Sequence, residues 1–156
     1  MTGVLAIVLL TAGRHAPLVV WNASPSSPRG LYVVTRGAPQ LGDYVLARAP
    51  EAAERLAVAR GYVSRGVPLV KSVAAGPGQR VCASGERLAV DGRRVAMRGS
   101  TDGAGRRLPR WNGCRTLVDG EILLLGSGGP ASFDSRYFGP VRAKRVLGRA
   151  RLVWRA

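Results

Sequence analysis

The chain has very few side chains that can accept a proton near neutral pH. It contains one histidine, His15, in an apolar N-terminal stretch, and only two of its 24 basic residues, Lys71 and Lys144, are lysines. The others are arginines, which stay protonated at any usable pH and cannot serve as bases. This shortage argues against a histidine-dependent catalytic triad and leaves Lys71 as the main candidate for an amine base.

Metal ligands are equally scarce. The two cysteines, Cys82 and Cys114, lie far apart in the chain, and the one histidine is remote from both. Protein zinc sites usually need three or four Cys, His or carboxylate ligands, several of them closely spaced. We therefore expect no metal and no cofactor.

Acidic and aromatic residues are too few to balance the basic ones or to alternate with them. Nine Asp and Glu residues leave a formal net charge of +15, and Phe, Trp and Tyr make up 6% of the chain. A basic β-domain that binds nucleic acid or an acidic partner is one function consistent with this charge. The sequence has no helix-turn-helix or RNA-binding motif and no aromatic residues interleaved with arginine. A solvated surface near anionic lipid fits the charge equally well, and we expect no nucleic-acid partner.

Lys71 itself lies inside the apolar run of residues 68–75. Burial of an ammonium group among apolar side chains costs several kcal/mol unless the group pairs or loses its proton. A change in its pKa from about 10.4 to about 8 corresponds to roughly 3 kcal/mol, which burial can supply. A structural lysine would usually point to water, so the position predicts a base and an activity that rises with pH.

Two further segments combine hydroxyl groups with turn-forming residues. Residues 22–32 read Asn-Ala-Ser-Pro-Ser-Ser-Pro-Arg-Gly-Leu-Tyr, which excludes a helix and favours an irregular turn or extended loop. Residues 126–139 begin with a glycine-rich loop and end in Phe-Asp-Ser-Arg-Tyr-Phe-Gly. Taken singly, each candidate segment has an ordinary interpretation as a turn, an exposed strand lysine or a surface salt bridge.

Taken together, these segments resemble the S26 family of Ser/Lys signal peptidases, and most closely its branch of conjugative-transfer TraF peptidases. The resemblance covers nearly the whole chain from Asn22 onward. Five ordered segments carry it: residues 26–32, 42–45, 60–71, 76–82 and 133–139.

The resemblance implies a Ser/Lys dyad. Ser26 would be the nucleophile, and Lys71 would be the base that removes its proton, which is a recognised variant of the catalytic triad. The Ser24 hydroxyl and the Ser26 backbone N–H would form the oxyanion hole.

The last matching segment would support the dyad. By the same resemblance, Ser132 would hydrogen-bond the Lys71 amine and orient it. Asp134 would form a salt bridge with Arg136 or another arginine and would take no direct part in proton transfer.

The implied function is that of a membrane-associated serine endopeptidase that processes an exported precursor. The reaction would be signal-peptide removal or pilin maturation, with or without cyclisation of the pilin. Expected partners are this precursor and membrane lipid, and the expected location is the bacterial inner membrane with the catalytic domain facing the periplasm. A LexA-like autoprotease would share the chemistry but would need an N-terminal DNA-binding domain, where this chain has an apolar segment.

The fold class that we expect is mainly β, an antiparallel sheet fold of the signal-peptidase and LexA type with one short helical insertion. Residues 50–60 predict the helix, because Pro50 suits a first turn, Glu51 and Glu54 favour the N-terminal dipole, and Gly61 follows. Asp91-Gly92 predicts a type I′ hairpin turn. Short β-like runs cover residues 31–34, 44–47, 67–73, 80–83, 87–90, 94–97, 121–125 and 146–150.

The N-terminal region is apolar over residues 3–12, which as a helix would be about 15 Å long against a hydrocarbon core of about 30 Å. Its extension to Trp21 adds Arg14, His15 and Pro17, which are costly at membrane depth. The segment is then either a marginal anchor or the end of a longer one that starts upstream. We expect residues 1–21 to be an uncleaved, membrane-proximal segment and residues 22–156 to be the catalytic domain.

Cys82 and Cys114 predict one disulfide if this β-rich domain is exported. In a cytosolic domain, both thiols would simply be small buried side chains.

Overall fold

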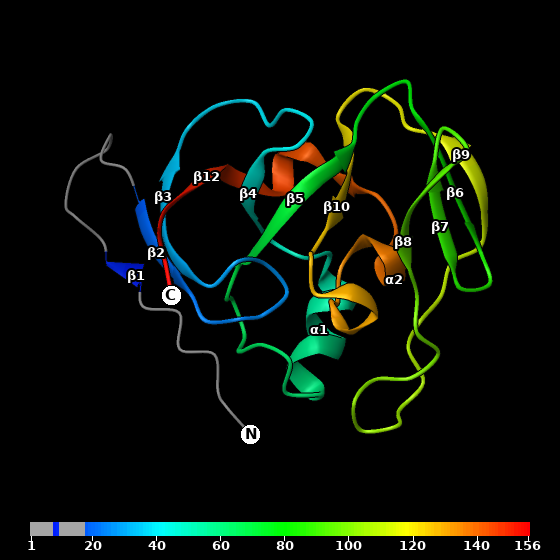
Figure 1. Cartoon of the computed structure of the whole chain (residues 1–156), viewed down its shortest axis with the longest axis horizontal. Coiled ribbons are helices and arrows are strands. Elements are labelled where there is room, and N and C mark those ends of the chain that lie inside the picture. Colours follow the sequence, from blue (N-terminus) through cyan, green and yellow to red (C-terminus); the bar gives the residue numbers. More distant parts are fainter. Residues whose placement is uncertain (1–7, 10–17) are drawn as a thin grey trace.

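The computed structural model describes residues 8–9 and 18–156, which form two antiparallel β-sheets with short helices beside them (Figure 1). The large sheet has the strand order β1-β2-β3-β12-β4-β5-β10-β11, and the small sheet has the order β8-β7-β6-β9. The predicted mainly-β, antiparallel fold class is confirmed.

The strands are β1 (Val8–Leu9), β2 (Leu18–Asn22), β3 (Gly30–Thr35), β4 (Tyr44–Ala47), β5 (Leu69–Ala75), β6 (Arg80–Ser84), β7 (Arg87–Val90), β8 (Arg93–Met97), β9 (Gly113–Thr116), β10 (Glu121–Leu125), β11 (Val141–Arg142) and β12 (Val146–Arg155).

The C-terminal strand β12 lies in the middle of the large sheet. It pairs with β3 on one side, from Arg149↔Thr35 to Arg155↔Gly30, and with β4 on the other, from Val146↔Ala47 to Ala150↔Tyr44. It therefore joins the β2–β3 hairpin to the β4–β5 pair.

Apolar side chains on both faces of the large sheet are buried. In strand β3 every second residue is buried and those between are half-buried or exposed, as expected when one face packs against a core. A further cluster contains Val81 and Leu88 of the small sheet together with Ala75 of β5 and Leu123 of β10, so it holds the two sheets together.

The predicted helix is present as α1 (Glu51–Ala59), and its buried face consists of Ala53 and Ala57. Pro50 lies at its N-cap, and Gly61 beyond its end has φ +71°, a conformation that glycine adopts at little cost. Short helical turns that the sequence did not predict follow β10 and β11: η1 (Gly129–Ala131), α2 (Ser135–Phe138) and η2 (Ala143–Arg145).

The predicted strands are all present, with ends that move by a few residues. The turn between β7 and β8 has positive φ at Asp91 and Gly92, as a type I′ hairpin requires. Four strands were not predicted. Strands β1 and β2 lie mostly in the predicted N-terminal segment, β9 is exposed throughout, and β11 has only two residues.

The predicted domain boundary at residue 22 falls inside strand β2. Leu18 to Trp21 pair with β3 from Val34 to Leu31, so these four residues belong to the sheet and not to a separate N-terminal segment. Residues 1–7 and 10–17 of the predicted segment lie outside the described residues. Within the described part of the chain, no helix is long and apolar enough to cross a membrane.

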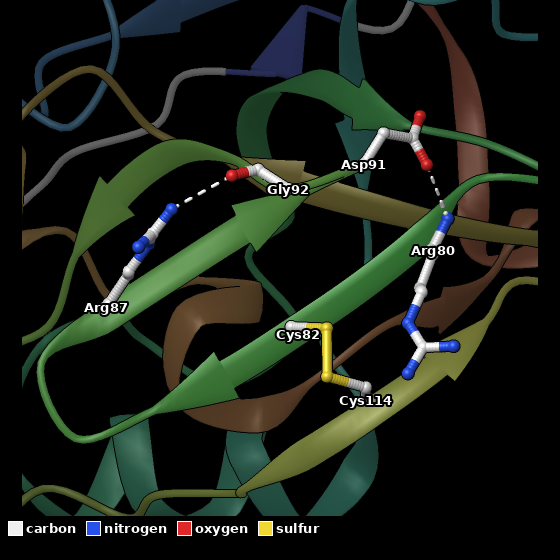
Figure 2. The surroundings of a disulfide bond; sticks show 6 residues. All are labelled: Arg80, Cys82, Arg87, Asp91, Gly92 and Cys114. Atoms are coloured by element: carbon white, nitrogen blue, oxygen red, sulfur yellow. Dashed lines mark hydrogen bonds between the residues drawn. A yellow bond between two sulfur atoms is a disulfide. The ribbon is translucent and has the colours of Figure 1, made fainter.

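A disulfide joins the neighbouring strands β6 and β9 of the small sheet. Cys82 pairs directly with Cys114 in the strand register, and their sulfur atoms are bonded, with Cα atoms 4.0 Å apart (Figure 2). At the end of the same sheet, the Arg80 backbone N–H donates to Asp91 at 2.9 Å. The disulfide closes a loop of chain that contains β7, β8 and the long connection from β8 to β9.

Candidate active site

The structure brings the predicted nucleophile and base into contact. Lys71 Nζ donates a hydrogen bond of 2.8 Å to Ser26 Oγ, although the two residues are 45 positions apart in the chain. Ser26 belongs to the turn that leaves β2, and Lys71 lies in the first half of β5. Strands β3, β12 and β4 separate β2 from β5 in the sheet, so the contact depends on the pairing of these five strands.

Lys71 is buried, with 2% of its surface exposed. In β5 it is paired with Val45, and strand alternation puts its side chain on the same face as buried Val73. Burial lowers its pKa from 10.5 to about 8, the nearby Asp134 carboxylate raises it, and the Arg136 guanidinium lowers it. A buried amine with this pKa is neutral in a substantial fraction of molecules slightly above neutral pH, so it can accept a proton.

Ser24 lies beside Ser26 on the other side. The two Oγ atoms are 3.0 Å apart, and the Ser26 backbone N–H donates to Ser24 Oγ at 3.3 Å. The predicted oxyanion-hole donors, the Ser24 hydroxyl and the Ser26 N–H, are therefore adjacent. The Ser24 hydroxyl can rotate, whereas the Ser26 N–H points at Ser24 Oγ and would have to exchange that bond for one to a substrate oxygen.

Asp134 and Arg136 form the predicted salt bridge, with Arg136 Nε 2.8 Å from Asp134 Oδ1 and both side chains almost fully buried. Asp134 also caps α2 by accepting from the Arg136 N–H at 3.0 Å, and it accepts from the Gly126 N–H at 2.7 Å. Arg136 in turn donates to the carbonyls of Gly126 and Gly129. The pair therefore holds the 126–129 loop at both ends.

Ser132 differs from its prediction. Its Oγ is buried, and among the described residues it has no hydrogen-bond partner, so the predicted hydrogen bond to the Lys71 amine is not formed. The side chain lies close to the dyad, because a methyl group built on Gly126 would be 2.8 Å from Ser132 Oγ and 3.1 Å from Lys71 Nζ. The hydroxyl is near the amine without being bonded to it.

Two glycines allow this close packing, and the sequence had not indicated a role for either. A Cβ atom on Gly126 would overlap the Ser26 carbonyl oxygen, and one on Gly128 would lie 3.1 Å from the Ser26 Cα. The loop backbone passes so close that the Ser127 N–H donates to the Ser26 carbonyl at 2.8 Å. The glycine-rich composition of residues 126–129 was the available signal, but it did not show what the loop contacts.

A cavity of about 310 Å³ opens beside the dyad. Helix α1 contributes Glu54 and Ala57 to its wall, so the helical insertion shapes the site. Tyr62, which follows the helix, donates to Asp102 at 2.5 Å and fixes the 99–112 connection over the cavity. Most of the remaining lining is apolar: Ala49, Val63, Val67, Leu69, Leu108, Ala131 and Phe133.

The described residues contain no group of three or more His, Cys, Asp or Glu side chains that could hold a metal ion. The chemistry available at the site is that of a serine hydroxyl, a buried amine and hydrogen-bond donors at an apolar cavity.

Comparison with known proteins identifies the family of the chain. The family model for signal peptidase, peptidase S26, matches residues 1–155. The chain is 39% identical to the conjugal transfer protein TraF of Agrobacterium fabrum strain C58 over 144 residues, which cover 85% of this chain and 80% of that protein. It is 32% identical to a plasmid transfer protein TraF of Escherichia coli over 152 residues, which cover 91% and 85%. A crystal structure of a signal peptidase I from Enterococcus faecalis V583 aligns with a TM-score of 0.43 and 22% identity over 74% of this chain and 98% of that chain. The chain belongs to the peptidase S26 family of signal peptidases.

Proposed function

We propose that this protein is a serine endopeptidase in which Ser26 is the nucleophile and Lys71 the general base. The hydrogen bond of 2.8 Å between Lys71 Nζ and Ser26 Oγ carries the proposal, because the amine is buried and its pKa is lowered to about 8. A serine hydroxyl is a weak nucleophile until a base within hydrogen-bond reach removes its proton.

The reaction would proceed in two steps. Neutral Lys71 takes the Ser26 proton while Oγ attacks the scissile carbonyl, and the resulting oxyanion accepts from the Ser24 hydroxyl and the Ser26 N–H. The Lys71 ammonium then protonates the leaving amine, which leaves an acyl group on Ser26. Water, or an amine of the substrate itself, attacks the ester after giving its proton to Lys71, so the same residues support hydrolysis or cyclisation.

The proposed substrate is an exported precursor, either a pilin or a protein with a signal peptide. Support comes from the relatives, which are named conjugal and plasmid transfer proteins TraF. The apolar cavity lining fits small apolar side chains next to the scissile bond.

We further propose that the protein works at the inner membrane with its catalytic domain in the periplasm. The rings of Trp21 and Trp154 lie against each other, with centroids 5.5 Å apart and planes tilted by 30°, and Trp154 is 57% exposed. Trp21 immediately precedes the segment that contains Ser26, and Arg151 and Arg155 are exposed on the same strand as Trp154. Exposed tryptophan and arginine side chains occur together at membrane interfaces, where the lipid headgroups accommodate both.

Processing of a co-expressed pilin or leader precursor in membranes tests the proposal. We expect wild-type protein to give a mature product and both Ser26→Ala and Lys71→Ala to give none, because each removes one partner of the proton transfer. The product mass read by spectrometry distinguishes the two outcomes, since a cyclic product is lighter than the linear fragment by one water. Processing that survives both substitutions would contradict the peptidase assignment and favour a basic binding domain.

Gly126→Ala should also lower the rate of processing about 100-fold or more, because its methyl group would push Ser26, Ser132 and Lys71 apart. Gly76→Ala is the matched control, since a Cβ there meets no atom within 4 Å. Rates for both variants are compared at equal amounts of folded protein. Equal rates would mean that the dyad tolerates displacement and that the close approach of this loop is incidental.

A further inference from the structure

Asn22 is the centre of a hydrogen-bond network that sets the shape of the serine loop. It is 7% exposed, and its Nδ2 donates to the carbonyls of Ser24, Ser27 and Pro28 at 3.1, 3.2 and 3.0 Å. The Ser24 N–H returns a bond of 3.1 Å to Asn22 Oδ1. One carboxamide therefore contacts four main-chain groups, which belong to residues on both sides of Ser26 in the sequence.

The loop needs such support because its own backbone cannot join a strand ladder. Pro25 and Pro28 flank the nucleophile and have no N–H to donate. Ser24 and Ser26 are only half-buried, so packing alone does not fix them. A loop of this kind takes its conformation from side-chain hydrogen bonds.

Ser27 connects this loop to the strand that carries the base. It is 2% exposed, and its Oγ donates a buried hydrogen bond of 2.7 Å to the Val70 carbonyl, 43 residues away. Ser27 follows the nucleophile directly, and Val70 directly precedes Lys71. The bond thus ties the two backbones together one residue away from each reacting side chain.

At Val70, strand β5 has a neighbouring strand on one edge only. Strand β10 pairs with β5 only from Ser72 to Ala75, so it does not reach Val70. Strand β4 pairs with Val70 through Leu46 on the opposite edge. The Ser27 hydroxyl thus supplies a fixed link between β5 and the serine loop where no neighbouring strand does.

We propose that Asn22 and Ser27 are positioning residues of this enzyme: Asn22 gives the serine loop its shape, and Ser27 fixes that loop to β5 beside Lys71. The proposal rests on the proposed function of Ser26 and Lys71. Neither residue touches the reacting atoms, so both act by holding Ser26 Oγ and Lys71 Nζ at bonding distance.

The test is the rate at which a fluorophosphonate reagent labels Ser26 in the full chain. We expect Ser27→Ala to lower the second-order rate constant about 10- to 100-fold, because a displacement of about 1 Å has an effect of that size. Ser27→Thr keeps the hydroxyl and should recover most of the rate. Asn22→Asp keeps the size of the side chain but removes its three donor contacts, and it should slow labelling to a similar degree.

Ser72→Ala is the matched control. It removes the same type of bond from the same strand, in this case Ser72 Oγ to the Leu125 carbonyl at 3.0 Å, but that bond links β5 to β10 and not to the serine loop. Its labelling rate should stay within about twofold of wild type, a difference small on the scale of a misplaced reacting group. The pH at which labelling is half-maximal should be unchanged in Ser27→Ala while the plateau falls, since the burial of Lys71 remains.

The outcomes separate this inference from the proposed function. If wild-type protein is not labelled, or if Lys71→Ala is labelled equally fast, the Ser/Lys function itself is wrong. If wild type is labelled in a Lys71-dependent manner and Ser27→Ala reacts as fast, or slows no more than Ser72→Ala, the positioning role is overturned. Should Ser27→Ala not fold, Asn22→Asp decides in the same way, with a wild-type rate overturning the proposal.

Discussion

Lys71→Met should abolish processing and at the same time make the folded protein more stable at neutral pH. The activity should fall by about 10⁴-fold or more, because the Lys71 amine is the basic group in contact with Ser26 Oγ. In the folded state the pKa of Lys71 is about 8, against about 10.5 for an exposed lysine, so folding at pH 7 buries a charge at a cost. Methionine fills similar space without that cost, and the gain in unfolding free energy should be about 3 kcal/mol.

The pH dependence gives this prediction its sign. A group whose pKa is lowered by folding penalises the folded state most below the lower value, and the penalty fades as pH rises toward the unfolded value. The stability difference between Lys71→Met and wild type should therefore be largest below pH 8 and small near pH 10.5, as measured by urea denaturation with the disulfide intact. Lys144→Met is the control, since Lys144 is exposed and should show no difference at either pH. Equal stability of Lys71→Met and wild type at pH 7 would show that burial does not disfavour the charged amine.

Asp134→Asn should destabilise the fold by about 3–5 kcal/mol, the usual cost of leaving a buried charge without its partner. Arg136 is 2% exposed and would keep its positive charge beside an uncharged amide. Asparagine keeps only one acceptor oxygen, so it can no longer accept from the Gly126 N–H through one oxygen and from Arg136 through the other. Because the Asp134 carboxylate raises the pKa of Lys71, residual activity should also reach half its maximum at a lower pH than in wild type.

Denaturation midpoints and a pH–rate profile measure these two effects. Glu51→Gln is the matched control, because it breaks a carboxylate–arginine pair with Arg55 whose side chains are 82% and 73% exposed. Such exposed pairs contribute at most about 1 kcal/mol, so this variant should behave like wild type. A denaturation midpoint for Asp134→Asn equal to that of Glu51→Gln would mean that the buried pair does not hold the loop.

Local signals in the sequence were sufficient for most of the secondary structure. The acidic first turn and alanine-rich face of residues 50–60 gave the helix, and Asp91-Gly92 gave the hairpin turn, because both depend on residues close together in the chain. Strand β9 escaped prediction, since an exposed Gly-Cys-Arg-Thr segment has no apolar alternation and is ordered by its pairing with β6.

The candidate site could be predicted only as far as motifs allow. The resemblance named Ser26, Lys71, Asp134 and Arg136. In the structure Lys71 contacts Ser26, and Arg136 contacts Asp134. The resemblance also predicted a hydrogen bond from Ser132 to the amine that is not formed. The contacts of Gly126 could not be predicted, because they depend on how the loops after β2 and β10 approach each other in three dimensions.

The central position of β12 has a consequence for the timing of activity. Protein synthesis is directional, and β12 follows all the other described strands in the chain. Until residues 146–155 are available, the β2–β3 hairpin, whose loop contains Ser26, and the β4–β5 pair, which contains Lys71, have no strand between them. A nascent chain should therefore carry Ser26 and Lys71 without holding them in contact until residues 146–155 have been synthesised.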